Sequence, residues 1–475
     1  MVVNAAHRSS RRPAAVGSLN SSSRFKLWKE QHVPLLYDWL SSRPLVWPSA
    51  AVQWGASIED SRRDRAPNNH TFSNHAVYLA ERTGNATTDP NTLLQFEIRV
   101  VHEYTNKPSD VARPWAEEAV VTDQSDANSS RDFALRKRII HPGEVNRIRL
   151  ISRDVVVTHT DSPHLFVWDF RKQPDRKARE VSHNIPDMTL MGHSSNAEYA
   201  IDVANAPGDD GDKWVLSGGK DCAVLLWRMQ DYQSSGQFLN PFVRMAGSHG
   251  IKNPVGHTGH IEDVSFCGKQ RNTVSSVGRD AALLLWDVRA PQSPTAFVNK
   301  AHRGDINCCD FGGICEYFIG TGGEDKVVRI WDTRKLKSTN DEPQPVRMLR
   351  GHTNEITNIM WNRNVSNVCA SGGDDGQVLV WKIEDTQLQR QAESQHYDAS
   401  PELIFRHIGH GIADAKISDL EWLPCSSDPW CIASLSETFG SGGSTLQVWR
   451  ISDIVYRPKE EVAADLRQFA RGRVI

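Results

Sequence analysis

A histidine–tryptophan pair recurs along the chain and constrains its fold more than any other feature. In each unit a Gly-His or Ala-His pair is followed about 30 to 40 residues later by Trp-Asp or by Trp and a basic residue. Five units pair His193 with Trp227, His257 with Trp286, His302 with Trp331, His352 with Trp381 and His410 with Trp449, and a degenerate sixth runs from His141 to Trp168. Such a period indicates that one small structural unit is repeated and stacked side by side.

Four of these units also carry an acid in a small-residue turn six residues before the Trp. These acids are Asp221, Asp280, Asp325 and Asp375, and each is followed by an apolar run, such as AVLLW or QVLVW, that suits a buried strand. Each unit is therefore a small sheet that cannot bury both faces alone, so the sheets must stack radially and close into a ring.

We therefore predict an all-β fold, a seven-bladed WD-repeat β-propeller with an N-terminal α-helix and a short C-terminal helix. The six units supply six blades. Residues 76–81 and 92–101 have the pattern of strands before the first unit, and we expect them to form the seventh blade with strand material from the C-terminal part.

The repeated His, Asp and Trp residues favour a structural network over a catalytic site, because a catalytic site would occur once. We expect each imidazole to bridge the turn carboxylate and a strand Ser or Thr, which satisfies buried polar groups. The sequence has no G-x-S-x-G, HExxH or P-loop motif and no cysteine–histidine cluster, and residues 440–443 have the composition of a hairpin loop. We expect no enzyme activity, no metal and no cofactor.

Composition narrows the class of partner. The chain has 55 basic and 58 acidic residues, a net charge of −3, so it has no overall positive field for DNA or an anionic membrane. No apolar run approaches a membrane span and no secretory signal is present, so we expect a soluble intracellular protein whose eight cysteines are core thiols. The N-terminus, with Arg8, Arg11 and Arg12, has the composition of a disordered basic tail or of a transit peptide, and is the sole candidate for nucleic-acid contact.

The predicted organisation has four parts. Residues 1–22 form the basic tail, 23–42 the N-terminal helix, 43–456 the propeller, and 457–475 the C-terminal helix and tail. The helix prediction rests on the apolar residues Phe25, Trp28, Leu35, Leu36, Trp39 and Leu40, which have nearly the spacing of one helical face. Val462, Leu466 and Phe469 have the same kind of spacing, so we expect the C-terminal helix to pack against the N-terminal one.

Three segments resemble a known family. WKEQHVPLLYDWLSSRPLVWPSAAVQW at residues 28–54, IIHPGEVNRIR at 139–149 and THTDSPHLFVWD at 158–169 resemble the histone-binding WD-repeat family of retinoblastoma-associated and multicopy-suppressor-of-ira proteins. The Gly-rich ending at residues 436–462 is most similar to the plant FVE branch. The resemblance implies a nuclear, non-enzymatic scaffold that binds histones H3 and H4, belongs to histone deacetylase, Polycomb or chromatin-assembly complexes, and acts in transcriptional repression.

The resemblance also implies a groove for a helix of histone H4, between the N-terminal helix and an acidic, Pro-containing loop. The matching residues are Trp28, Leu35, Leu36, Trp39, Leu40, Asp398, Pro401 and Glu402. An apolar wall facing carboxylates suits a basic amphipathic helix. Ser400 stands where the family commonly has a second Pro. Alternatively, the helix packs on the propeller and the loop is simply solvated.

Acidic residues also gather a few positions after each repeat histidine, where the innermost strands begin. On a propeller these positions converge on the mouth of the central channel, where they would focus negative potential on a basic peptide. With the family pattern for the H3 tail, the predicted mouth residues are Glu144, Asn146, Glu198, Tyr199, Glu262, Asp263, Asn307, Glu355, Asp419 and Glu437, with Asp305 nearby. Arg279 departs from the pattern, because an acid is common there. The alternative is a structural scaffold whose acidic mouth binds nothing.

Three units end in W-D-x-R, with Arg171, Arg289 and Arg334 at the last position. This pattern occurs in substrate receptors of cullin ubiquitin ligases that use a propeller adaptor, so such a receptor is the alternative function. The motif is short, and each arginine is equally well explained by a surface ion pair.

Overall fold

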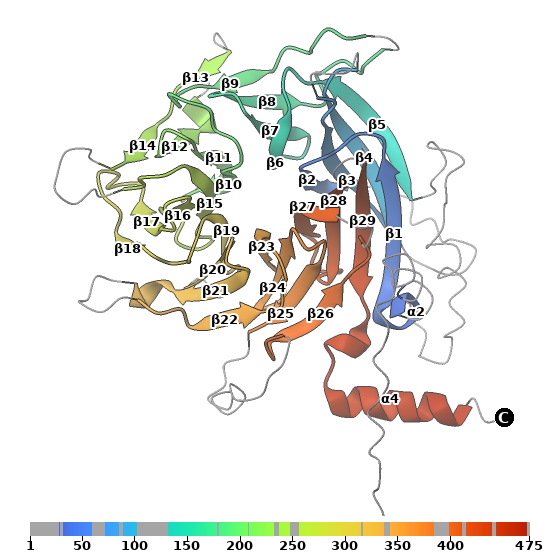
Figure 1. Cartoon of the computed structure of the whole chain (residues 1–475). Helices are drawn as coiled ribbons and strands as arrows, with labels where there is room; N and C mark the ends of the chain where they lie inside the picture. Colours follow the sequence, from blue (N-terminus) through green and yellow to red (C-terminus); the bar gives the residue numbers. More distant parts are fainter. Residues whose placement is uncertain are drawn as a thin grey trace, which may run out of the picture.

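Seven small sheets form a closed ring around a central channel (Figure 1). The structure is a computed structural model, and it describes residues 28, 32–58, 72–84, 89–101, 132–177, 180–207, 209–231, 237–247, 256–314, 317–336, 343–383, 399–410, 415–438 and 443–472. The seven-bladed propeller predicted from the repeat is confirmed.

Blade 1 is built entirely from N-terminal residues. Its strands are β2 (Val52–Ile58), β3 (Phe72–Glu81), β4 (Thr92–Val101) and β5 (Phe133–Ile140), each antiparallel to the next. The two strands expected before the first repeat therefore exist as β3 and β4. Their expected pairing with C-terminal strand material is wrong, because β2 and β5 complete this sheet.

Blades 2 to 6 each take four strands in chain order, and blade 2 takes a fifth from the stretch that builds blade 3. Blade 2 has β6 (Val145–Ser152), β7 (Val155–Thr160), β8 (Leu165–Asp169) and β9 (Met188–Leu190), and β13 (Phe238–Leu239) adds a parallel fifth strand. Blade 3 has β10 (Ile201–Ala206), β11 (Asp209–Gly218), β12 (Ala223–Arg228) and β14 (Val243–Ala246), with the 3-10 helix η3 (Met229–Asp231) after β12.

The next three blades follow the same plan. Blade 4 has β15 (Ile261–Phe266), β16 (Thr273–Gly278), β17 (Leu283–Asp287) and β18 (Ala296–Val298). Blade 5 has β19 (Ile306–Phe311), β20 (Phe318–Gly323), β21 (Val327–Asp332), the 3-10 helix η4 (Thr333–Lys335) and β22 (Arg347–Arg350). Blade 6 has β23 (Ile356–Trp361), β24 (Val368–Gly373), β25 (Val378–Lys382) and β26 (Leu403–His407).

The ring closes in blade 7, where β27 (Ala415–Trp422), β28 (Cys431–Thr438) and β29 (Gly443–Ile451) pair with the N-terminal strand β1 (Tyr37–Leu45). Figure 1 shows the blue strand β1 along the red strand β29. This corrects the C-terminal end of the helix predicted over residues 23–42, because the chain is extended from Tyr37 onward and belongs to β1, while helix α2 covers Val33–Leu36. Most of residues 23–31 lie outside the described residues, so the rest of that helix stays a prediction. Residues 37–45 instead cover the edge of β29, which would otherwise be left unpaired.

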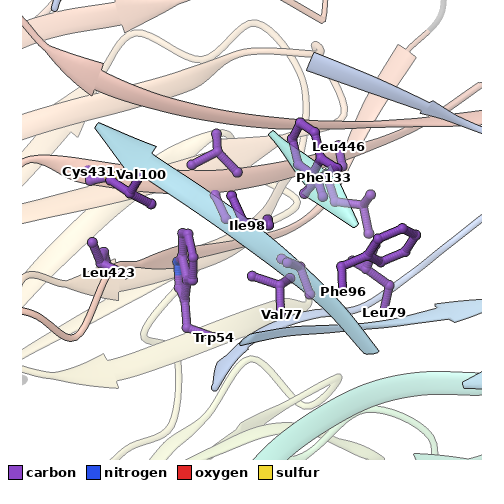
Figure 2. Packing of buried hydrophobic residues seen from close by; sticks show 14 of the residues in the cluster. Trp54, Val77, Leu79, Phe96, Ile98, Val100, Phe133, Leu423, Cys431 and Leu446 are labelled. Atoms are coloured by element: carbon purple, nitrogen blue, oxygen red, sulfur yellow. The ribbon is translucent and has the colours of Figure 1, made fainter. Parts of the chain in front are cut away.

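Packing between blades 7 and 1 gives the closure its hydrophobic core. Trp54, Val77 and Ile98 of blade 1 belong to one buried cluster with Leu423, Cys431 and Leu446 of blade 7 (Figure 2). Because the cluster joins residues from both ends of the chain, its burial stabilises the closed ring rather than a single blade.

The repeat histidines form the expected structural network. Nδ1 of His257 lies 2.9 Å from Asp280, and its Nε2 lies 2.7 Å from Ser276, to which the indole of Trp286 also donates. Equivalent bridges join His193 to Asp221 and Ser217, His302 to Asp325 and Thr321, and His352 to Asp375 and Ser371. Three units depart from this pattern. Trp227 donates to the backbone carbonyl of Met191, the His410 imidazole contacts Ser436 and Ser434 rather than a carboxylate, and that of His141 contacts the Gly143 carbonyl and Thr158.

The C-terminal helix is also confirmed, as α4 (Lys459–Gly472) after the 3-10 helix η6 (Asp453–Val455). Tyr456, between them, stacks on Trp430 with ring centroids 4.3 Å apart. The expected packing of α4 on the N-terminal helix stays a prediction, because the side chains of Leu466 and Phe469 are outside the described set. No helix in the described part of the chain is long and apolar enough to cross a membrane.

Candidate peptide-binding surfaces

The mouth of the central channel is the first candidate surface. Its inner strands start just after the repeat histidines, and the half-buried residues there are Glu144, Glu198, Tyr199, Glu262, Asn307, Glu355 and Glu437. Burial raises the pKa of the Tyr199 phenol, and the neighbouring carboxylates Glu198 and Glu262 raise it further. Tyr199 therefore lies between acids of two neighbouring blades, as the sequence predicts.

Two predicted mouth residues lie inside the wall instead. Asp263 and Asp419 are only 6% and 2% exposed. Asp263 accepts the backbone N–H of Cys309 at 2.9 Å, and Asp419 accepts that of Val52 at 3.0 Å. Each carboxylate thus joins its own inner strand to that of the next blade, so the placement of these two residues at the mouth is corrected.

Asp202 and Asp310 have the same role and were missed from the sequence. Asp202 accepts the backbone N–H of Phe266 at 2.8 Å, and Asp310 accepts that of Trp361 at 2.7 Å. The signal was the recurrence of an Asp within the inner strand of several repeats, which alternation places on the channel side. Asn146, also predicted at the mouth, is 8% exposed and so is largely buried.

Below the mouth, charged side chains fill the channel. Arg147, Arg149 and Arg363 lie there among the four aspartates just described, with Asn358, and leave a cavity of about 50 Å³. Arg147 pairs with Asp419 at 3.3 Å, and burial raises the pKa of Asp263 to about 6 although Arg147 lies nearby. Charged and polar side chains from several blades therefore line the channel below the mouth.

Cations pair with some of the mouth acids. Arg279 donates to Glu262 at 2.5 Å, Lys220 donates to Glu198, and Lys416 to Asp374. Glu144, Glu355 and Glu437 have no ion pair within the described residues. The sequence singled out Arg279, but the two lysines were missed, because their pairing depends on strand geometry that spacing alone does not reveal.

The N-terminal segment forms the second candidate surface. Trp28 and Tyr37 pack edge-on against each other and against His407 of β26, and the Tyr37 hydroxyl lies 2.8 Å from Nδ1 of His407. The segment therefore lies against β26, directly after the loop that contains Pro401. The groove between this segment and the loop stays a prediction, because Asp398 and part of the segment lie outside the described residues.

Several residues predicted for that groove are not on its surface. Trp39 and Leu40 lie on strand β1 and are 3% and 4% exposed, so both belong to the core. Trp28 is also buried, and Glu402 is buried beside Arg347 at 3.6 Å. Asp398 and the side chain of Leu35 lie outside the described residues.

Half-buried apolar side chains pack on the same core as the N-terminal segment, and only Leu36 among them was singled out from the sequence. They are Leu36, Ile404, Ile408, Val455 and Tyr456, which pack on the core shared by blades 6 and 7. Ile404 and Ile408 come from β26 and the residue after it, and Val455 and Tyr456 follow the last strand. Pro401 is exposed at the start of the same strand.

The W-D-x-R arginines form one repeated local structure. Nε and one terminal nitrogen of Arg171 donate to the two oxygens of Asp169, both at 2.9 Å, and Arg289 and Arg334 pair with Asp287 and Asp332 in the same way. All three arginine side chains are largely exposed, at 66%, 71% and 60%. The expected surface ion pair therefore exists, and each guanidinium is held in a fixed orientation.

Within the described residues, no group of three or more His, Cys, Asp or Glu side chains is placed to hold a metal ion.

Comparison with known proteins agrees with this geometry. Residues 23–102 match the family model for the histone-binding protein RBBP4 and its counterpart in the CAF1 complex, and residues 294–332 and 343–382 match the WD domain, G-beta repeat. The WD-40 repeat-containing protein MSI4 of Arabidopsis thaliana is 36% identical over 474 residues, which covers 94% of this chain and 85% of the relative. The chain belongs to the histone-binding WD-repeat family that includes RBBP4 and MSI4.

Proposed function

We propose that this protein binds histones H3 and H4 and acts in the nucleus as a non-enzymatic scaffold within chromatin-modifying or chromatin-assembly complexes in transcriptional repression. Histone deacetylase, Polycomb and chromatin-assembly complexes are the candidate assemblies, and family membership supports this class of partner. The observation that carries the proposal is the acidic mouth, whose Glu144, Glu355 and Glu437 have no ion pair among the described residues.

The mouth fits an extended basic peptide such as the H3 tail. Carboxylates from several blades gather at one opening, which concentrates the negative potential there. Lys and Arg side chains would pair with these carboxylates by charge-assisted hydrogen bonds. Tyr199 and Asn307 offer polar contacts that would fix the register of the peptide backbone.

The N-terminal surface fits the H4 helix. Leu36, Ile404, Ile408, Val455 and Tyr456 are half-buried apolar side chains on the core that the N-terminal segment shares, and apolar side chains of this kind would receive one face of an amphipathic helix. Glu402 is already paired with Arg347, so a histone arginine would compete with Arg347 for it or use the acid at position 398. Apolar contact therefore carries more of this proposed interface than the sequence suggested.

The test is binding of the purified full chain to separate H3-tail and H4-helix peptides by calorimetry. Glu355→Lys should weaken the H3 peptide alone, and Leu36→Asp should weaken the H4 peptide alone. Glu355 is chosen over Glu262, because Glu262 is already occupied by Arg279. If the wild-type protein binds neither peptide, the histone proposal fails.

One observation keeps a second function open, that of a substrate receptor of a cullin ubiquitin ligase. Arg171, Arg289 and Arg334 are exposed and are each oriented by an aspartate of their own blade, which preorganises them for a partner surface. Pull-down with the propeller adaptor decides between the functions. Arg289→Ala with Arg334→Ala should abolish adaptor capture while Glu355→Lys leaves it intact, and no capture by wild-type protein would exclude a receptor role.

A further inference from the structure

The turn residue that precedes each network aspartate is basic in blades 3 and 4 and acidic in blades 5 and 6. The residue directly before the network aspartate is Lys220 in blade 3, Arg279 in blade 4, Glu324 in blade 5 and Asp374 in blade 6. These residues occupy equivalent β-turns, so blades 3 and 4 present two cations while blades 5 and 6 present two acids, of which Asp374 is paired with Lys416 of blade 7. The mouth is therefore divided by charge rather than uniformly acidic.

Each of the two cations pairs with an acid from its own blade. Arg279 is 48% exposed and donates through Nε to Glu262, whose side chain is only 13% exposed. Hydrogen bonding and attraction from Glu262 raise the pKa of Arg279, and Asp305 and Glu198 add to this. Lys220 pairs with Glu198 in the same manner. The protein's own cations thus occupy two carboxylates that an incoming basic side chain would use.

The backbone around Lys220 and Arg279 is held by hydrogen bonds. If a ligand displaces these side chains from their carboxylates, they therefore stay at the mouth. Arg279 precedes Asp280, which accepts hydrogen bonds from the His257 imidazole and the Thr258 backbone N–H at 2.9 Å. Lys220 is held likewise, because Asp221 lies 3.0 Å from Nδ1 of His193. A basic ligand side chain that takes over Glu262 or Glu198 therefore leaves an unpaired cation within the mouth.

We propose that the mouth selects a basic peptide that carries a phosphate beside its basic residue, as in a phosphothreonine or phosphoserine next to an arginine or lysine. This inference rests on the proposed binding of a basic tail at the mouth. The ligand cation pairs with Glu262 or Glu198, and the released Arg279 and Lys220 bind the phosphate, whose charge and three acceptor oxygens suit a guanidinium and an ammonium. The exchange is feasible, because partly exposed ion pairs are weak.

The test uses an H3 amino-terminal peptide and the same peptide phosphorylated on a threonine adjacent to an arginine, with affinities measured by fluorescence anisotropy on the full chain. Wild-type protein should bind the phosphopeptide about tenfold more tightly than the unmodified peptide. The double variant Lys220→Gln with Arg279→Gln should reverse this order, because it frees both carboxylates and removes the phosphate ligands. Arg279→Lys, which keeps the charge, should retain the preference for phosphate.

Lys269→Gln is the matched control, since Lys269 is exposed in the turn that follows β15, at the end of that strand remote from the mouth, and should leave both affinities unchanged. If wild-type protein binds the unmodified peptide but phosphorylation weakens binding, this inference is overturned while the proposed function stands. If the double variant keeps the phosphate preference, the assignment to Lys220 and Arg279 is wrong. If wild-type protein binds neither peptide, both fail.

Discussion

The carboxylate of Asp419 in β27 accepts a hydrogen bond from the backbone N–H of Val52 in β2, at an N···O distance of 3.0 Å. The other oxygen of Asp419 accepts from Arg147, at 3.3 Å, and from the Asn358 amide, at 3.1 Å. This one side chain therefore connects blades 1, 2, 6 and 7 at the centre of the ring. Its role is to hold the closed ring together rather than to meet a ligand.

Removal of this carboxylate should destabilise the fold strongly. Asp419→Ala leaves the buried Arg147 guanidinium without its partner, so we expect the free energy of unfolding to fall by about 3 to 5 kcal/mol in urea denaturation. Glu355→Ala is the control, because Glu355 is half-exposed at the mouth and its removal should cost less than about 0.5 kcal/mol. Equal stabilities for the two variants would contradict the role of Asp419.

A second buried carboxyl predicts how stability changes with pH. Glu421 accepts hydrogen bonds from Gln53 and from the backbone of Trp54, and burial raises its pKa to about 8 from 4.5. Since the folded-state pKa lies above the unfolded one, the stabilising contribution is full below pH 4.5 and is lost as pH rises through 8. From pH 7 to 8 this contribution should fall by about 1 kcal/mol.

The comparison protein for that titration is Glu421→Gln, which cannot ionise. Buried histidines such as His141, whose pKa is lowered to about 4 by burial, act in the opposite direction, because acid charges them in the unfolded state first. Both proteins share this effect, so it cancels in the difference between their unfolding free energies. A difference that does not change between pH 7 and 8 would show that Glu421 is ionised in the folded protein.

Gly84 and Gly376 have positive φ, and substituting each with alanine distinguishes the cost of backbone strain from the cost of a steric clash. Gly376 (φ +70°) lies in the blade 6 turn, where an added Cβ would lie 2.6 Å from the carbonyl oxygen of Ala415, whereas Gly84 (φ +65°) faces open space. Gly84→Ala should cost about 1 kcal/mol, for the left-handed conformation alone. Gly376→Ala should lower the thermal midpoint further, and a smaller loss than for Gly84→Ala would count against the close contact between blades 6 and 7.

Leu36 and Leu40 should respond differently, although the sequence assigned both to one helical face. Leu40 is 4% exposed on β1, so Leu40→Ala should cost about 2 to 5 kcal/mol of unfolding free energy. Leu36 is only partly buried, so Leu36→Ala should cost less and should weaken an H4-helix peptide instead. If Leu40→Ala left stability unchanged but lost the peptide, the strand assignment of residues 37–45 would be wrong.

The blades were predictable from the repeat. The hydrogen-bonded residues of each repeat, a His, an Asp, a Ser or Thr and a Trp, all lie in one blade, and strand length fixes their spacing in the sequence. The ring closure was not predictable in this way. Trp39 and Leu40 fit the helical period of the preceding apolar residues, yet they lie in a strand that is buried on both faces. The choice between helix and strand there depends on β29, about 400 residues away in the chain.

The contacts of the acidic residues that follow the repeat histidines were also only partly predictable from the sequence. Glu262 and Asp263 are adjacent in sequence, but alternation along β15 sends one toward the mouth and the other into a hydrogen bond with blade 5. Spacing predicts that such residues gather at one end of the propeller, yet it does not tell a ligand-facing carboxylate from one that the next blade already uses. Lys220, which neutralises Glu198, was missed for the same reason, and Arg279 was singled out without its pairing with Glu262.

The most direct test of the central claim is the affinity of an unmodified H3-tail peptide for wild-type protein and for Glu355→Lys, measured at one fixed salt concentration, with Glu460→Lys on the exposed face of α4 as control. The mouth account predicts that Glu355→Lys weakens binding about tenfold or more, because it places a cation where the peptide needs an anion. It predicts no change for Glu460→Lys. Equal affinity of the wild-type protein and Glu355→Lys would contradict it.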